Sequence, residues 1–236
     1  MKRLIDGAKR LGLSLSSEQV NKFETYYQEL VGWNKRVNLT SIVDYEEVQV
    51  LHFLDSLTAL LIVPADSLSL SAIDVGSGGG LPGIPLKIVC PSWRFVLVDS
   101  VGKKTAFLRH VIQRLGLADV QVITERAENL AREAGYREQF DLVLSRAVAS
   151  LPTLLELTLP FCRVGGLVVA HKSKDVEREI NLATKALALL GGRLNRVEAV
   201  PLEEFAGEHV LVVVDKVAPT PEKYPRRAGI PKKRPL

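Results

Sequence analysis

Two short apolar runs, joined through a glycine-rich turn, constrain this chain more than any other feature of its sequence. The first run, SAIDVGSGGGLPG, covers residues 71–83, and the second, RFVLVDS, covers residues 94–100. A strand that leads into a glycine turn and a helix, followed by a strand that ends in an acid, is typical of the ligand-binding end of a Rossmann-type sheet. The acid is Asp99, 21 residues beyond Gly78, a spacing that suits a carboxylate binding a ribose diol.

The turn itself separates two classes of nucleoside ligand. A dinucleotide-binding loop carries its third glycine three residues after the second, so that the N-terminus of the next helix meets a pyrophosphate. This chain has Leu81 at that position. Pro82 and Pro85 follow, and because proline is tolerated only in the first turn of a helix, we expect the helix to begin near residues 83–85. The sequence therefore predicts a poor cradle for a pyrophosphate.

The loop instead reads Asp-x-Gly-x-Gly-x-Gly from Asp74 to Gly80, which puts an acid at the end of the first strand, where it could face a cationic ligand. S-adenosyl-L-methionine carries an amine and a sulfonium and no phosphate. The loop therefore favours it over a nicotinamide cofactor, which stays open as an alternative. A glycine-rich turn without any ligand is also open but disfavoured, because each glycine adds to the conformational entropy lost on folding.

Apolar runs alternate with helical stretches from residue 71 onward, which indicates a mostly parallel α/β sheet with crossover helices on both faces. We expect seven strands with a closing hairpin, the Rossmann-like arrangement of class I adenosylmethionine-dependent methyltransferases. The strands are expected at 72–75, 95–98, 120–124, 140–144, 167–170, 197–200 and 209–214, and the main helices at 103–116, 152–161 and 175–190.

The residues before this alternation, 1–68, are expected to be helical. Ser16 can cap a helix, with Gln19 three residues later as in a capping box. A second helix is expected from Asp44 to just before Pro64, where the proline would end it.

A chain of 236 residues can bury one substantial α/β core with something appended, but it cannot form two large domains. We divide it into a helical extension at 1–68, a Rossmann-like domain at 69–218 and a basic, proline-rich tail at 219–236. Cys90 and Cys162 lie in apolar runs without metal-ligand spacing, as expected in a reducing compartment. With no apolar run near the ~20 residues of a membrane span and no signal sequence, we expect a cytoplasmic protein.

Positive charge is concentrated at the C-terminus. Residues 223–236, KYPRRAGIPKKRPL, hold six of the 31 lysines and arginines and none of the 27 acids, although the formal net charge of the chain is only +4. Since the prolines oppose helix and central strand, we expect an extended cationic segment of the kind that neutralises phosphates. A tail that only increases solubility stays open as an alternative.

Polar residues that follow the strands are candidate site residues, because ligands of such sheets bind beyond the carboxyl ends of the strands. Asp99 is the candidate for the ribose and Glu128 for the adenine amino group, with a solvated helix start as the alternative for Glu128. Arg146 lies in the run SRAV after the fourth strand, where adenine-N6 methyltransferases usually carry Asn or Asp before Pro-Pro and an aromatic residue. Its guanidinium could bind a guanine edge or a phosphate, order the cofactor pocket, or form a surface ion pair.

Six motifs, which together cover nearly the whole chain, resemble one family, the guanine-N7 methyltransferases of bacterial small-subunit ribosomal RNA known as RsmG or glucose-inhibited division protein B. Their joint occurrence is far more specific than the glycine loop alone. The motifs are WNKRVNLTSI at 33–42, HFLDSL at 52–57, DVGSGGGLPGIPLKI at 74–88, LVDSVGKKTAFL at 97–108, FDLVLSRAVASL at 140–151 and YPRRAGIPKKRPL at 224–236.

The resemblance implies an enzyme that methylates N7 of a guanine, expected at position 527, in the decoding-centre loop of 16S rRNA, with S-adenosyl-L-methionine as cofactor. Many members carry Thr and Phe where this chain has Ser77 and Leu81, a difference small enough to leave cofactor binding intact. By matching motif positions, the family's cofactor contacts fall on Gly76, Leu81, Ala127, Glu128 and Arg146, to which the loop and strand-end arguments add Asp74, Gly78 and Asp99.

Guanine N7 has a lone pair and no proton to lose, so in-line attack on a methyl sulfonium needs no general base. Catalysis would come from near-attack geometry and from a pocket that stabilises charge developing on the purine, with Arg146 as the predicted catalytic residue. We expect a monomer that acts on 16S rRNA or the 30S subunit and uses neither a metal nor a membrane. A noncatalytic RNA-binding or assembly protein and a small-molecule methyltransferase stay open as alternatives.

Basic side chains are the candidate RNA contacts, although each could alone be a solvated charge. His52 and Asp55, together with the segment WNKRVNLT, receive no role from the sequence, and a helix-surface position is the plain interpretation of both residues. The candidate RNA contacts are Lys103, Lys104, Arg109, His171, Lys172, Arg226, Arg227, Lys232, Lys233 and Arg234.

Overall fold

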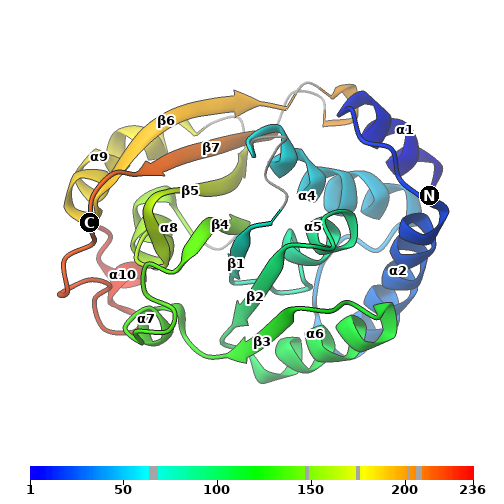
Figure 1. The fold of residues 1–236 in the computed structure, drawn as a ribbon, viewed down its shortest axis with the longest axis horizontal. Coiled ribbons are helices and arrows are strands. Elements are labelled where there is room, and N and C mark those ends of the chain that lie inside the picture. Colours follow the sequence, from blue (N-terminus) through cyan, green and yellow to red (C-terminus); the bar gives the residue numbers. More distant parts are fainter. Residues whose placement is uncertain (64–68, 147–148, 174–175, 201, 206–208) are drawn as a thin grey trace.

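A seven-stranded sheet runs through the computed structural model, which describes residues 1–63, 69–146, 149–173, 176–200, 202–205 and 209–236 (Figure 1). The strand order is β3-β2-β1-β4-β5-β7-β6, in which β1 to β5 pair in parallel and β7 runs antiparallel to β5 and β6. The predicted fold class is confirmed, including the closing hairpin. The strands are β1 Ser71–Val75, β2 Arg94–Asp99, β3 Val120–Thr124, β4 Phe140–Arg146, β5 Cys162–Ser173, β6 Gly192–Ala199 and β7 His209–Lys216.

Helices cover both faces of this sheet, and each face has its own apolar core. Successive strand side chains point to opposite faces, so that Leu97 packs into one core and Val98 into the other. The first core contains α5 Gly83–Val89, α6 Gly102–Leu115 and the N-terminal helices, and the second contains α7 Ala127–Leu130, α8 Leu151–Thr158 and α9 Glu177–Leu190. No helix in the described part of the chain has the length and apolar character that a bilayer crossing needs.

The N-terminal extension packs directly on the first of these cores. Its helices are α1 Lys2–Arg10 and α2 Ser17–Val37, followed by α3 Tyr45–Glu47, a π-helix η1 Val48–Leu54, α4 Asp55–Leu57 and a 3-10 turn η2 Thr58–Leu61. The predicted capping box is confirmed, since the Gln19 N–H donates to the Ser16 hydroxyl at 3.2 Å and the Ser16 N–H donates to the Gln19 side chain at 2.9 Å. Pro64, predicted to end the second helical segment, lies outside the described residues.

The middle of that second segment is wider than an α-helix. Asp44 caps its start as predicted, and Val48–Leu54 then form a π-helix, a local form that occurs often at functional sites. The π-turn carries His52, and Asp55 follows it directly.

The C-terminal tail differs from its prediction. The tail folds back onto α7 and α8. The Arg137 guanidinium binds its first part by donating to the carbonyl oxygens of Thr220 at 2.7 Å and Tyr224 at 3.0 Å. Its last part contains a short helix, α10 Ile230–Lys233. The expectation of an extended segment is therefore wrong here. Pro231 occupies the first turn of α10, where a missing N–H removes no hydrogen bond, so the proline does not oppose the helix.

Candidate functional site

Two connected pockets open at the carboxyl ends of the parallel strands. The large pocket has a volume of about 680 Å³ and the small pocket about 430 Å³, and Gly76, Lys104 and Arg146 line both. The large pocket is also lined by Leu39, Thr40, His52, Asp55, Gly78, Leu81, His171, Lys172 and His209, and the small pocket by Asp99, Val101, Glu125, Ala127, Glu128, Thr153, Leu157, Pro231 and Lys232.

The glycine loop between β1 and α5 lines the large pocket, and its first residue, Gly76, lines both pockets. Gly76, Gly78 and Gly80 have φ angles of +77°, +56° and +90°, in the left-handed region that side chains with a Cβ disfavour. A Cβ on Gly80 would lie 2.4 Å from Ile84 Cδ1, so this position requires glycine for space as well. The glycines therefore fix the backbone form of the loop, which meets the small pocket at Gly76 and the large pocket along most of its length.

Asp99 fixes the loop from the neighbouring strand. Its carboxylate accepts the Gly78 N–H at 2.9 Å and the Val101 N–H at 2.8 Å, and only 7% of the residue is exposed. The predicted ribose-binding acid thus lines the small pocket with its carboxylate already oriented by two backbone donors.

Asp74 does not lie as predicted. It is fully buried beneath the loop, and its Oδ2 accepts the Gly83 N–H at 3.0 Å. Burial raises the pKa of Asp74 to about 7, against the opposing effect of the Gly83 hydrogen bond. The expectation that Asp74 faces a ligand is wrong, because its side chain is buried and hydrogen-bonded to the first N–H of α5, that of Gly83.

Glu128 lines the small pocket and is almost fully buried. Its Oε1 accepts the Gly229 N–H at 2.8 Å and an Arg126 N–H at 3.1 Å, and 4% of the residue is exposed. Burial alone would raise the pKa of Glu128, but the hydrogen bonds from Gly229 and Arg126 outweigh it and leave the pKa below its ordinary value. The alternative of a solvated helix start is excluded by this burial.

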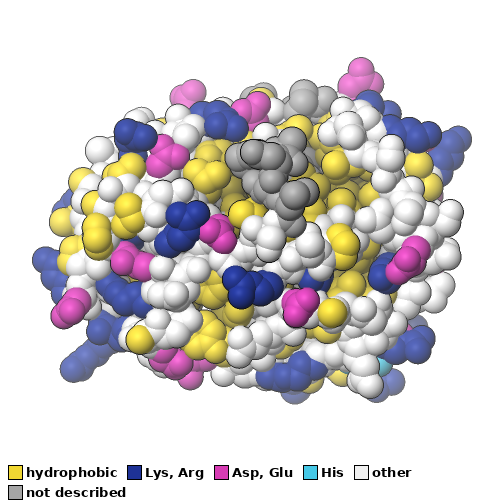
Figure 2. Space-filling view, viewed as in Figure 1, with side chains coloured by type: hydrophobic (Ala, Val, Ile, Leu, Met, Phe, Trp, Pro, Cys, Tyr) yellow, Lys and Arg dark blue, Asp and Glu magenta, His cyan; other side chains and the backbone are white. Residues whose placement is uncertain are grey.

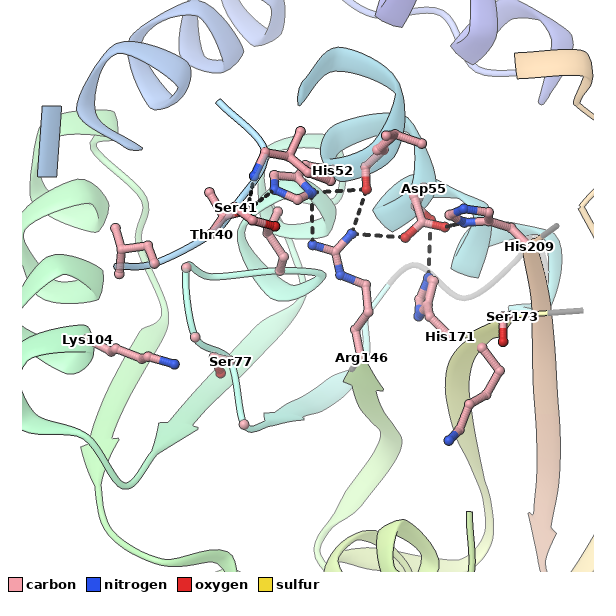
Figure 3. A pocket seen from close by; sticks show the side chains of 18 of the residues that line it. Thr40, Ser41, His52, Asp55, Ser77, Lys104, Arg146, His171, Ser173 and His209 are labelled. Atoms are coloured by element: carbon pink, nitrogen blue, oxygen red, sulfur yellow. Dashed lines mark hydrogen bonds and ion pairs between the residues drawn. The ribbon is translucent and has the colours of Figure 1, made fainter. Parts of the chain in front are cut away.

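A network of buried polar groups surrounds Arg146 at the end of β4 (Figure 3). The Arg146 guanidinium donates to Asp55 Oδ2 and to the Leu51 carbonyl, each at 2.9 Å, and lies 3.3 Å from His52 Nδ1. Its side chain is 15% exposed and that of Asp55 4%, so this ion pair is buried rather than on the surface. The sequence alternative of a surface ion pair is therefore half right: the acid is present, and water is largely excluded.

Asp55 is the centre of this network. Sheet register places His171 of β5 opposite Arg146 of β4, and the start of β7 brings His209 alongside. His209 Nδ1 lies 2.9 Å from Asp55 Oδ1, and the His171 Nε2–H donates to the Asp55 carbonyl at 3.1 Å. Burial acts to raise the pKa of Asp55, but the neighbouring His171, His209 and Arg146 hold it well below its usual range.

His52 joins the same network to the loop after α2. Its Nε2 lies 2.7 Å from the Thr40 hydroxyl, and burial together with Arg146 lowers the pKa of His52 to about 4, so the ring is neutral at pH 7. Asn34 shapes the loop by accepting the N–H groups of Leu39 and Thr40 at 2.6 and 2.9 Å. The helix-surface interpretation of His52 and Asp55 is wrong, since they are 5% and 3% exposed.

The predicted basic contacts fall into three groups. Lys104, His171 and Lys172 line the large pocket, although Lys172 is paired with Glu179 at 2.6 Å. The guanidinium of Arg226 is bound to buried Glu156. The remaining candidates are exposed: Lys103, Arg109, Arg227, Lys232, Lys233 and Arg234. Of these, Lys232 also lines the small pocket, and Arg109 donates to the Thr124 hydroxyl on the edge strand β3.

The chemistry of the small pocket suits an adenosyl group and a sulfonium better than a pyrophosphate. Its acids, Asp99, Glu125 and Glu128, can accept hydroxyl and amino hydrogens and attract positive charge. The N-terminus of α5, which a pyrophosphate would need, is already bonded to the Asp74 carboxylate. Among the described residues, no group of three or more His, Cys, Asp or Glu side chains is arranged so that it could hold a metal ion.

Comparisons with known proteins identify the family of the chain. The family model of rRNA small subunit methyltransferase G matches residues 19–206. A ribosomal RNA small subunit methyltransferase G from Dehalococcoides mccartyi is 47% identical over 237 residues, covering 100% of both chains, and one from a Roseiflexus species is 49% identical over 236 residues, again covering 100% of both.

Solved structures show the same fold. A SAM-dependent methyltransferase from Aquifex aeolicus matches with a TM-score of 0.55 at 16% identity, covering 80% of this chain and 98% of that one. The complex of M. jannaschii TYW2 with AdoMet matches with a TM-score of 0.50 at 18% identity, covering 63% of this chain and 70% of that one. By the family model and the full-length relatives, the chain belongs to the rRNA small subunit methyltransferase G family.

Proposed function

We propose that this protein transfers a methyl group from S-adenosyl-L-methionine to N7 of a guanine in bacterial 16S rRNA. Membership of the family supports the reaction and the class of substrate. The observation that carries the proposal is the meeting of two pockets at Gly76, Lys104 and Arg146, which gives a methyl donor and an acceptor base separate sites with a common boundary.

The small pocket is the donor site in this proposal. Asp99 would bind the ribose hydroxyls, Ala127 and Glu128 the adenine, and the backbone of Gly76, which lines both pockets, the methionyl part. Gly78 lines the large pocket and would act on the donor site through its hydrogen bond to Asp99. The bound donor supplies an electrophilic methyl group on its sulfonium. The protein supplies orientation and charge, because the N7 lone pair needs no base to deprotonate it.

The large pocket is the acceptor site, and Arg146 is its catalytic residue. The Arg146 guanidinium is held at the common boundary by Asp55 and Leu51, so that its charge is fixed before a base enters. The fixed guanidinium can donate to the O6 acceptor of a guanine and so hold N7 in line with the methyl group, whose bond to sulfur breaks as the bond to N7 forms. Neutral His52 and the Thr40 hydroxyl add hydrogen-bonding groups to the same wall.

Exposed cations around the pockets provide the approach for RNA. Figure 2 shows Lys and Arg side chains projecting from the margin of the molecule where the C-terminal segment lies. We assign the rRNA contacts to the exposed Lys103, Arg227, Lys233 and Arg234, and to the half-buried Lys104, which lines both pockets. The protein is proposed to work as a monomer in the cytoplasm.

The test is a methylation assay with labelled S-adenosylmethionine on deproteinised 16S rRNA and on 30S subunits. Reductive aniline cleavage, which reports N7 methylation, then maps the modified nucleotide. We expect label in rRNA and cleavage at one guanine, and the better of the two substrates identifies the natural one. Label without cleavage would contradict N7 as the target. An absence of label on both substrates would favour a noncatalytic RNA-binding protein.

A further inference from the structure

We propose that the C-terminal segment 229–232 is part of the donor-binding site, with Pro231 as a wall of the small pocket and Gly229 as a positioning residue that acts through Glu128. The inference rests on the proposed function, since it takes the small pocket as the donor site. The tail thereby has a role other than the phosphate-binding arm that its composition predicts.

Direct contacts place this segment at the pocket. Pro231 and Lys232 line the small pocket, and Pro231 is buried. The Gly229 N–H donates to Glu128 Oε1 at 2.8 Å, and the Thr153 hydroxyl donates to the Pro231 carbonyl at 3.1 Å. Glu128 and Thr153 themselves line the pocket, so the segment is bonded to two other residues of the same wall.

A second set of contacts anchors the tail just before this segment. The Arg226 guanidinium binds the carboxylate of fully buried Glu156 through Nε at 2.9 Å and through NH2 at 2.6 Å, and the Arg226 backbone N–H donates to the same carboxylate at 2.8 Å. Thr153, Glu156 and Leu157 share one face of α8, so one helix face both holds the tail and lines the small pocket. The tail is therefore built into the pocket.

Gly229 links the tail to Glu128 through its backbone alone. Its φ of +82° lies in the left-handed region, and a Cβ built there meets no heavy atom within 4 Å. Alanine at this position would thus act by strain on the backbone that carries the N–H. Since that N–H orients the Glu128 carboxylate, the strain reaches the donor site without any change of pocket side chain.

The experiment is isothermal titration of Gly229→Ala with S-adenosylmethionine and with S-adenosylhomocysteine, without RNA. The matched control is Gly12→Ala, because Gly12 has a φ of +77° and the same open space around its Cβ but lies after α1. We expect the Gly229→Ala Kd to rise about tenfold, the size of one lost hydrogen bond to a charged group, and the control Kd to stay unchanged. Equal Kd values for both variants and the wild type would overturn the inference.

Pro231→Ala keeps the proposal testable if Gly229→Ala fails to fold, because it removes part of the wall and leaves the Gly229 N–H in place. A several-fold rise in its Kd is expected, against none for Pro235→Ala, which changes an exposed proline of the same tail outside the pocket. If the wild type and Pro231→Ala bind the donor equally well, only this inference is contradicted. A wild-type protein that binds neither ligand contradicts the proposed function and this inference together.

Discussion

Arg146 depends on residues that the sequence keeps far apart. The cation is held by Asp55 and Leu51 of the N-terminal extension while its own strand lies in the sheet, so the extension fixes the geometry of the boundary between the two pockets. A planar guanidinium with several donors can bind a carboxylate and a carbonyl at once, which an ammonium group does with less defined geometry.

At this residue scale, Arg146→Lys tests whether geometry or charge alone is needed. We expect turnover in the rRNA methylation assay to fall about a hundredfold, the usual effect of losing one preoriented electrostatic group, with the circular dichroism spectrum preserved. Arg193→Lys is the control, because Arg193 forms an ion pair with Asp215 while its side chain is 70% exposed. Unchanged turnover in Arg146→Lys would remove the guanidinium from the catalytic role.

Asp55→Asn tests the other partner by stability. Removing one charge of a buried pair leaves the other uncompensated, so we expect a loss of about 3–5 kcal/mol in urea unfolding at pH 7. Asp215→Asn, at an exposed pair, should cost under about 1 kcal/mol. The folded pKa of Asp55 is lowered, so its stabilisation is present above its ordinary pKa of 3.8 and pH 7 measures it fully. Equal losses in the two variants would show that the Asp55 network is not stabilising.

At the scale of elements, the turn from β1 into α5 is held by the carboxyl group of Asp74, which the sequence predicted to face a ligand. Asp74 takes the place at the α5 N-terminus where a dinucleotide fold would bind phosphate. The alternation along β1 leaves Asp74 with no exposed surface, which sets its pKa near 7. This single buried acid thus both stabilises the loop and restricts the ligand class.

Asp74→Asn tests this through the pH dependence of stability. Because the folded pKa of about 7 lies above the ordinary 3.8, the contribution of Asp74 is full below pH 3.8 and is lost as the pH rises to about 7. Between pH 5 and pH 8, wild-type stability should fall relative to the variant by roughly 2–3 kcal/mol in urea unfolding. Asp215→Asn is the control: it removes an acid whose folded pKa is lowered and keeps Asp74, so its stability should fall between pH 5 and pH 8 as that of the wild type does. Parallel curves for wild type and Asp74→Asn would contradict a buried neutral carboxyl group.

At the scale of the whole molecule, the elements followed from local patterns and the network did not. Short apolar runs located five of the seven strands to within two residues, whereas β5 and β6 each begin five residues earlier than predicted. The capping box at Ser16 is encoded within four positions. β5 begins earlier than predicted, at Cys162, because pairing with Phe140 of β4 extends it past the glycines. The polar residues His52 and Asp55 in the apolar run VQVLHFLDSL were the available signal, but the partners of Asp55 come from three strands, β4, β5 and β7.

The tail shows why composition alone could not separate its cations. Arg226 and Arg227 are adjacent and chemically identical, yet the Arg226 guanidinium binds buried Glu156 while Arg227 is exposed. Only tertiary packing against α8 distinguishes them. Binding to a phosphate backbone releases counterions, so an exposed cation that contacts RNA changes the salt dependence of affinity, and a cation held by a buried acid does not.

Filter binding of 16S rRNA at several salt concentrations, together with urea unfolding, should distinguish the roles of Arg226 and Arg227. Arg227→Ala is expected to reduce the slope of log K against log salt by about 1 and to leave stability unchanged. Arg226→Ala is expected to leave the slope unchanged among folded molecules and to lose about 3 kcal/mol of stability, because Glu156 would stay buried without its partner. The reverse pattern would mean that the tail leaves α8 when RNA binds, and that its packed form is not the one that meets the substrate.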